Sequence, residues 1–213
     1  MKPTMNVLCL CLAAAAGLLA NSAHGANLIK NGSFETPVVI AGSYELVSTG
    51  DTFTGWKVVG ATGNVGIVSG TFEQSGFTFP AAGGSQWLDL TGNSNTVTGV
   101  QQTVATTAGT AYTLTFYIGN VDDPGGILGV SSTVNVLVNG KQVFTGTNSK
   151  GTGESKQVWQ KFATTITAAS GHTTIAFMNG DSPSDNSNGL DLVSLVVQAD
   201  DEPAADLDPG VQD

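Results

Sequence analysis

The sequence has no arginine, and its two cysteines both lie near the N-terminus, at positions 9 and 11. Seven lysines stand against seventeen acids, which gives a formal net charge of −10. A nucleic-acid-binding protein needs positive charge to neutralise phosphates. This balance argues against nucleic acid as a partner.

Long apolar runs are also scarce, and the clearest one follows Lys2 in the first twenty residues, where it is too short to span a bilayer. With the small residues Ala23 and Gly25 behind it, this stretch predicts a signal peptide over 1–25. An N-terminal membrane anchor is the alternative. We therefore expect an exported protein, periplasmic or extracellular, with no membrane span in the mature chain.

The predicted mature chain has no cysteine and one histidine, His172. This removes disulfides, cysteine chemistry, histidine-ligated metal centres and most catalytic triads. Glycoside hydrolysis needs only two carboxyls at a set separation, so it stays open for Glu73, Asp89, Asp122 and Asp123, although nothing marks a pair among them. We expect a protein that is not an enzyme.

The mature chain shows apolar alternation with a period of two and no helical period. The pattern predicts about ten strands, at 53–59, 64–69, 85–90, 97–105, 111–118, 133–138, 141–144, 156–167, 173–178 and 190–198. Asn139-Gly140 between two apolar runs predicts a type I′ hairpin. We expect an all-β jelly-roll sandwich over 26–198, followed by an acidic disordered tail over 199–213.

Several motifs resemble a known family. These are Asn27-Leu-Ile-Lys-Asn-Gly-Ser-Phe-Glu35, Gly55-Trp56, Gln101-Gln102, Tyr112-Thr-Leu-Thr-Phe116 and Leu190-Asp-Leu-Val-Ser-Leu195. Over 27–197 the chain resembles the galactose-binding-like β-sandwiches, in particular the bacterial choice-of-anchor C proteins and the plant cell-wall proteins of domain-of-unknown-function 642. The resemblance implies a jelly roll that binds carbohydrate, or that lies in a polysaccharide-rich matrix, without catalytic residues.

The same resemblance implies a structural calcium ion between the two ends of the domain, with Glu35 and Asp191 as its carboxylate ligands. Calcium binds several hard oxygen ligands, which two carboxylates and backbone carbonyls can supply. A cysteine-free exported domain would gain stability from such a clasp. In the alternative, Glu35 accepts hydrogen bonds from backbone amides and Asp191 faces solvent.

Sugar binding needs an aromatic face for stacking and polar side chains that read hydroxyl groups. If Leu88 and Leu90 face inward, Trp87 and Asp89 face outward and form a candidate ligand pair. Tyr117 also points outward by alternation, and Asn120, Asp122 and Asp123 follow it closely enough to meet at one end of the sandwich. A buried Trp87 and an ordinary solvated turn at 120–123 are the alternatives.

The function that these features predict is a secreted, non-catalytic carbohydrate-binding module whose partner is a cell-wall or extracellular polysaccharide. The alternative is an extracellular matrix or envelope scaffold that acts through protein contacts. Retention on a polysaccharide distinguishes the two.

Overall fold

The structure is a computed structural model that describes residues 25–183 and 187–198. The predicted signal peptide, apart from Gly25, and the predicted acidic tail lie outside the described residues. Within this part of the chain every regular element is a strand. The strands are β1 (Tyr44–Ser48), β2 (Thr52–Phe53), β3 (Trp56–Gly60), β4 (Asn64–Ser69), β5 (Glu73–Gln74), β6 (Phe77–Thr78), β7 (Gln86–Asp89), β8 (Thr98–Ala105), β9 (Ala111–Asn120), β10 (Ser132–Val138), β11 (Lys141–Asn148), β12 (Val158–Thr167), β13 (His172–Asn179) and β14 (Gly189–Val197).

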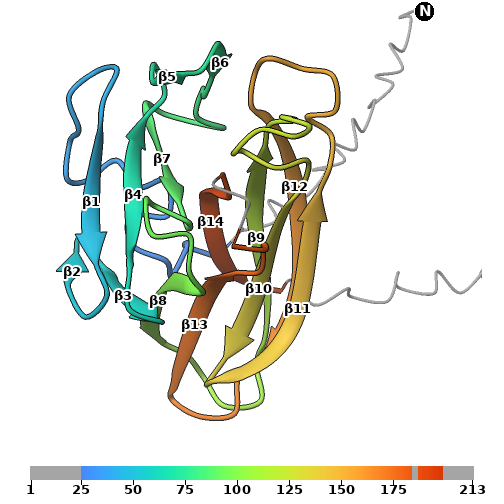
Figure 1. Cartoon of the computed structure of the whole chain (residues 1–213). Helices are drawn as coiled ribbons and strands as arrows, with labels where there is room; N and C mark the ends of the chain where they lie inside the picture. The colour runs from blue at the N-terminus through green and yellow to red at the C-terminus, as the bar shows by residue number, and fades with distance from the viewer. Residues whose placement is uncertain (1–24, 184–186, 199–213) are drawn as a thin grey trace, which may run out of the picture.

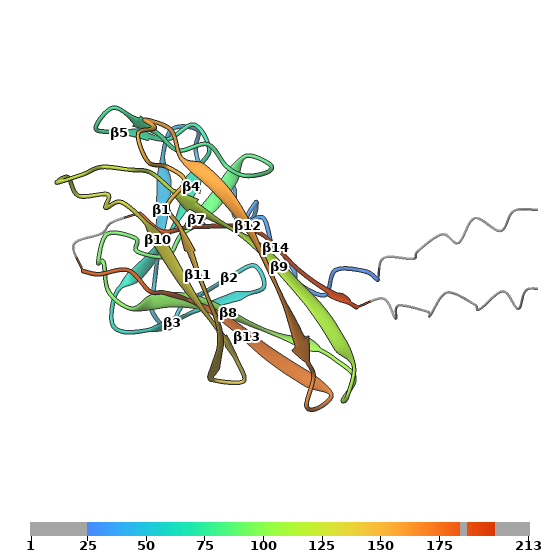
Figure 2. The ribbon, with the colours of Figure 1, turned by 90° about the vertical axis from the view of Figure 1, so that its right-hand side faces the viewer.

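Two antiparallel sheets of six strands pack face to face, and a small hairpin, β5–β6, stands at one end (Figures 1 and 2). The first sheet has the order β1-β4-β7-β14-β9-β12, and the second has the order β11-β10-β13-β8-β3-β2. Most neighbours within a sheet are distant in the sequence, so the fold is closed by long-range pairing. This confirms the all-β sandwich predicted from the sequence.

The main core lies between the sheets and follows the alternation read from the sequence. Leu114, Phe116 and Ile118 of β9 are fully buried, and Phe116 meets Phe177 of the opposite sheet at 5.1 Å between ring centroids. Trp56 is buried in the same core. The apolar face of each strand therefore sets which of its residues point outward.

The Asn139-Gly140 hairpin is confirmed. Both residues have positive φ, 50° and 81°, and they join β10 to β11. Positive φ at both central positions is what a type I′ turn requires, and it matches the twist of the two strands.

Strand boundaries differ from the prediction where turns interrupt the pattern. The single strand expected at 53–59 is two strands, because Gly55 takes φ 83° and turns the chain between Phe53 and Trp56. The sequence reading missed β1, β5 and β6, whose residues are exposed or half-buried and show no clean alternation.

Candidate binding site

The outer face of the first sheet carries a second apolar cluster, formed by Val68, Phe79, Trp87, Val121 and Leu128. The alternation that buries Leu88 and Leu90 in the main core turns Trp87 and Asp89 to this outer face. We call residues 72–81, which include β5 and β6, the covering segment, because they lie over this cluster.

The covering segment is fastened by two indole groups. Trp87 Nε1 donates to the Phe79 carbonyl at 3.0 Å, and Trp159 Nε1 donates to the Pro80 carbonyl at 2.8 Å. The Phe79 ring stacks on Trp87 with centroids 6.1 Å apart. Backbone pairing of Thr78 with Ser155 and Gln157 adds to this attachment. The covering segment and the sheet thus hold a fixed space between them.

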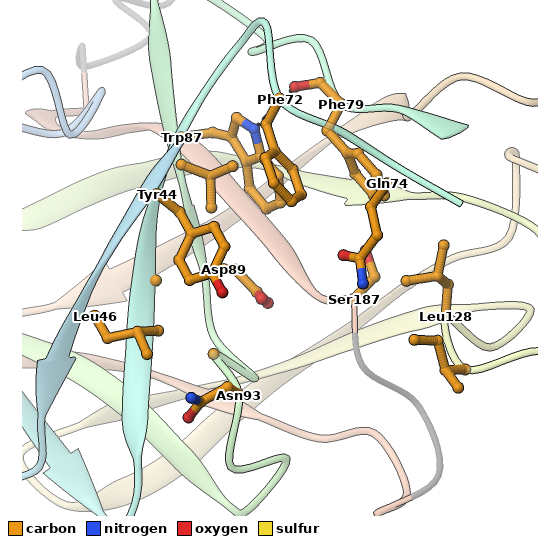
Figure 3. A pocket seen from close by; sticks show the side chains of 14 residues that line it. Tyr44, Leu46, Phe72, Gln74, Phe79, Trp87, Asp89, Asn93, Leu128 and Ser187 are labelled. Carbon is orange, nitrogen blue, oxygen red and sulfur yellow. Dashed lines mark hydrogen bonds between the residues drawn. The ribbon is translucent and has the colours of Figure 1, made fainter. Parts of the chain in front are cut away.

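That space is a pocket of about 210 Å³. Strands β1, β4 and β7 form its floor, and the covering segment, the 92–93 turn and the 127–128 loop form its sides. Figure 3 shows the side chains arranged around the pocket, with the Asp89 carboxylate between the aromatic and amide groups. The lining comprises Tyr44, Leu46, Gly66, Val68, Phe72, Gln74, Phe79, Trp87, Asp89, Gly92, Asn93, Ile127, Leu128 and Ser187.

Asp89 lies deep in the pocket and is held from one side. Its Oδ1 accepts hydrogen bonds from the Thr91 amide at 3.0 Å, the Thr91 hydroxyl at 2.7 Å and the Asn188 amide at 3.3 Å. Burial raises the pKa of Asp89 to about 6, although these hydrogen bonds act in the opposite direction. The side chain keeps partial exposure because it faces the pocket. It is a positioned hydrogen-bond acceptor that is charged at neutral pH.

The remaining walls combine aromatic faces with amides. Tyr44 is 47% exposed at the pocket, and its ring meets Phe72 edge-on at 5.5 Å. Asn93 is fixed by Asn64, whose Nδ2 donates to the Asn93 Oδ1 at 2.6 Å. Gln74 approaches from β5. Apolar rings with a carboxylate and two amides can pack one face of a small polar molecule and hydrogen-bond its edge.

Gly66 keeps the floor open. A Cβ added there would make ordinary contacts, 3.6 Å to the Asp89 Cβ and 3.6 Å to Val68, and the backbone has no positive φ. A larger side chain at this position would therefore extend into the pocket without first disturbing the strand.

The structure brings the predicted pair Trp87 and Asp89 together at one pocket. Trp87, however, is only 2% exposed, because Phe79 and the rest of the second cluster cover the outer face of β7. The expectation of an exposed Trp87 ring is wrong. The residue forms a wall and an anchor for the covering segment.

The other predicted ligand residues do not reach this pocket. Tyr117 is half-buried on the outer face of β9 and lines a separate shallow depression with Pro80 and Trp159. Asn120 is fully buried, its Nδ2 donating to the Val121 carbonyl and its Oδ1 accepting from the Gly151 amide. A ligand role for Asn120 is therefore a wrong expectation, since its amide is used inside the fold.

The two neighbouring acids each hold a loop. Asp122 Oδ2 accepts from the Gly153 amide at 2.9 Å, and Asp123 Oδ2 accepts from the Leu128 amide at 3.3 Å. The expected meeting of Tyr117 with these carboxylates does not occur around one cavity. Asp123 still matters to the pocket indirectly, because it shapes the loop that carries Leu128.

Glu35 and Asp191 both grip the loop that precedes β7. Glu35 Oε1 accepts from the Ser85 and Gln86 amides at 2.9 and 3.0 Å, while Asp191 Oδ2 accepts from the Ala82 and Gly83 amides at 2.9 and 3.1 Å. Asp191 is fully buried, so the expectation that it might face solvent is wrong. Burial raises the pKa of Asp191 to about 7, and the nearby Glu35 charge adds to that rise.

These contacts test the calcium proposal. Asp191 uses both oxygens, since its Oδ1 also accepts from the Leu192 amide at 2.6 Å. A cation at Asp191 would have to compete with three amide hydrogens that point at the carboxylate. The arrangement does not fit a calcium ion. It fits two carboxylates that bind backbone amides, the alternative raised for Glu35.

Sequence reasoning missed Tyr44, Phe72, Gln74 and Asn93 as pocket residues. Tyr44 lies on an irregular edge strand and Phe72 and Gln74 on the covering segment, so no periodicity marks them. The glycine between two apolar residues of β4, at Gly66, was the available signal, because glycine inside a strand often marks a place where something approaches the backbone.

The described residues contain no helix long and apolar enough to cross a membrane. No curated protein matches the chain. Among solved structures, a cyclase from Fischerella sp. TAU is similar with a TM-score of 0.51 at 20% identity, covering 80% of this chain and 95% of that one.

Two further structures are more distant. The family 35 carbohydrate-binding module from Paenibacillus barcinonensis has a TM-score of 0.40 at 15% identity, over 72% of this chain and 99% of that one. An isomalto-dextranase from Arthrobacter globiformis has a TM-score of 0.42 at 15% identity, over 71% of this chain but only 23% of that one.

The fold is thus the all-β sandwich that the sequence motifs predict, and the Fischerella cyclase is similar to it in fold. A family also matches in sequence, from Asn27 through Leu195, which spans all the motifs on which the resemblance was based. The chain therefore belongs to the family described as "Protein of unknown function (DUF642)", which matches residues 27–195.

Proposed function

We propose that this protein is an exported, non-catalytic module that binds a carbohydrate in the pocket between the covering segment and strands β1, β4 and β7. The observation that carries the proposal is Asp89, a carboxylate held through Oδ1 and facing a cavity with aromatic walls. The evidence for export is the signal-peptide pattern at 1–25. The test is the molecular mass of the protein recovered outside the cytoplasm, which should lack residues 1–25.

The chemistry of the lining suits a sugar. A pyranose has one face of C–H groups that packs on an aromatic ring, and hydroxyl groups around its edge. Tyr44 and Phe72 offer rings, and the carboxylate of Asp89 accepts from hydroxyl donors. The amides of Gln74 and Asn93 both donate and accept, as hydroxyl groups do.

The same lining supports binding without catalysis. Among the described residues that surround the pocket, Asp89 is the single carboxyl, and histidine, cysteine and lysine do not occur. Glycoside cleavage by a pair of acids needs a second carboxyl about 5–10 Å from the first. Binding alone needs only what the pocket contains.

The test is glycan binding by a variant that fills the pocket. We expect the purified protein to bind on a glycan array, and Gly66→Leu to lower the signal at least about tenfold, equivalent to about 1.4 kcal/mol. Gly171→Leu is the control, because Gly171 does not line the pocket and a Cβ there would make one ordinary contact, 4.0 Å to the Thr106 carbonyl oxygen. Thermal melts should show both variants folded.

Two results would count against this function. If wild type binds no glycan on the array, the pocket has another ligand or the protein acts as a scaffold through protein contacts. If Gly66→Leu binds glycan as well as wild type does, the glycan binds at another face.

A further inference from the structure

We propose that the pocket selects an uncharged sugar ring and rejects the corresponding uronic acid. The inference rests on the proposed glycan-binding function and adds the class of sugar. It is carried by the charge and the size of the pocket, which together decide what can enter.

The charge argument concerns the carboxylate of Asp89 and the absence of a counter-charge. Of the described lining residues, Asp89 alone has a carboxyl group, and none carries positive charge. A uronate would bring a second carboxylate close to Asp89 in a partly desolvated space. Like charges a few ångströms apart repel strongly where water is excluded, so one of the two would have to take up a proton or stay outside.

Neighbouring groups do not offset this repulsion. The groups that donate to Asp89, from Thr91, Gly92 and Asn188, are all uncharged. Gln74 and Asn93 are neutral amides. Lys156 lies on the separate depression beside Tyr117. A neutral hydroxymethyl group in place of the uronate carboxyl would instead donate a hydrogen bond or remain uncharged.

The size argument concerns how much of a glycan the pocket holds. At about 210 Å³ it is smaller than the roughly 300–1,000 Å³ typical of pockets for drug-sized ligands. The space suits one sugar ring, and Tyr44, at 47% exposed, lies where that ring would enter. If a single ring lies inside, the group on its exocyclic carbon, hydroxymethyl or carboxylate, determines whether a second negative charge lies beside Asp89.

The experiment compares matched sugars that differ only in that substituent. We would titrate the protein at pH 7.5 with methyl galactoside against the methyl glycoside of galacturonic acid, and with methyl glucoside against the methyl glycoside of glucuronic acid, each acid with its carboxylate free, by isothermal calorimetry and by NMR. We expect the neutral member of at least one pair to bind about tenfold or more tightly than its uronate, a difference of about 1.4 kcal/mol.

Two variants separate charge from shape. Asp89→Asn should reduce the difference in affinity between a neutral sugar and its uronate to below about threefold. The substitution removes the negative charge, while the side-chain oxygen still accepts from Thr91. Tyr44→Ala should weaken both members of a pair and leave their ratio unchanged. If Asp89→Asn does not fold, wild type at pH 5 replaces it, since protonation of Asp89 should narrow the same difference.

The outcomes are distinct. A uronate that binds wild type as tightly as its neutral partner overturns this inference while leaving glycan binding in place. A difference that persists in Asp89→Asn or at pH 5 also overturns it, because the selection would then come from shape. Failure of every sugar, and of the glycan array, overturns the proposed function itself.

Discussion

Asp89 and Asp191 are both acids in buried surroundings, and burial raises the pKa of each, to about 6 and about 7. Backbone amides that donate to the carboxylates act the other way but do not cancel the effect. Raised pKa values mean that the folded protein binds protons more tightly than the unfolded chain does. The contribution of these two groups to the free energy of unfolding is therefore fully present below about pH 4. It is lost as the pH rises through about 6 for Asp89 and about 7 for Asp191.

We expect the free energy of unfolding of wild type to fall between pH 4.5 and pH 7.5, and Asp191→Asn to reduce that fall by about 1–3 kcal/mol. Urea denaturation of wild type and variant at the two pH values measures these free energies of unfolding. Asp51→Asn is the control, because Asp51 is an exposed turn residue. An Asp191→Asn protein with the slope of wild type would show that Asp191 titrates normally in the folded state.

The covering segment is the element on which the pocket depends most. Its attachment includes one indole hydrogen bond from Trp159 to the Pro80 carbonyl and backbone bonds that join Thr78 to Ser155 and Gln157. It belongs to neither large sheet, so it should open more easily than they do.

Trp159→Phe keeps an aromatic ring and removes the indole donor, which should cost about 1 kcal/mol of local stability. We expect hydrogen exchange at the Thr78 and Gln157 amides to become about fivefold faster. Trp56→Phe removes a similar donor, from Trp56 to the Asn31 carbonyl, but inside the main core. Faster exchange at Thr78 in both variants, or in neither, would mean that Trp159 does not hold the segment.

The elements that the sequence predicted well are those with one simple physical determinant. Alternation placed Phe116 in the core, and paired turn residues placed the hairpin at Asn139-Gly140. The pocket was predictable only in part. The phase of β7 turned Trp87 and Asp89 outward, but the residues that cover Trp87 come from a segment whose position depends on contacts about eighty residues away, with Ser155 to Trp159.

At the scale of the whole molecule, the two ends of the domain are joined without a disulfide among the described residues. Asn27 Oδ1 accepts from the Ile29 amide at 3.0 Å and from the Leu195 amide at 2.9 Å, and its Nδ2 donates to the Val193 carbonyl at 3.3 Å. The backbones of Leu28 and Leu195 also bond, as do those of Gly32 and Val193. The clasp expected of a metal ion is thus made by an asparagine and backbone groups.

This clasp should act independently of calcium. Asn27→Ala removes three hydrogen bonds and should lower the free energy of unfolding by about 1–3 kcal/mol, and Asn27→Asp, which keeps the acceptor, should lower it less. Because backbone amides already donate to the Asp191 carboxylate, the melting temperature of wild type should be the same in chelator and in millimolar calcium. The loss of unfolding free energy on Asn27→Ala should likewise be equal in the two solutions. A rise of several degrees with calcium, removed by Glu35→Gln, would instead show that an ion displaces those amides and ties the two ends together.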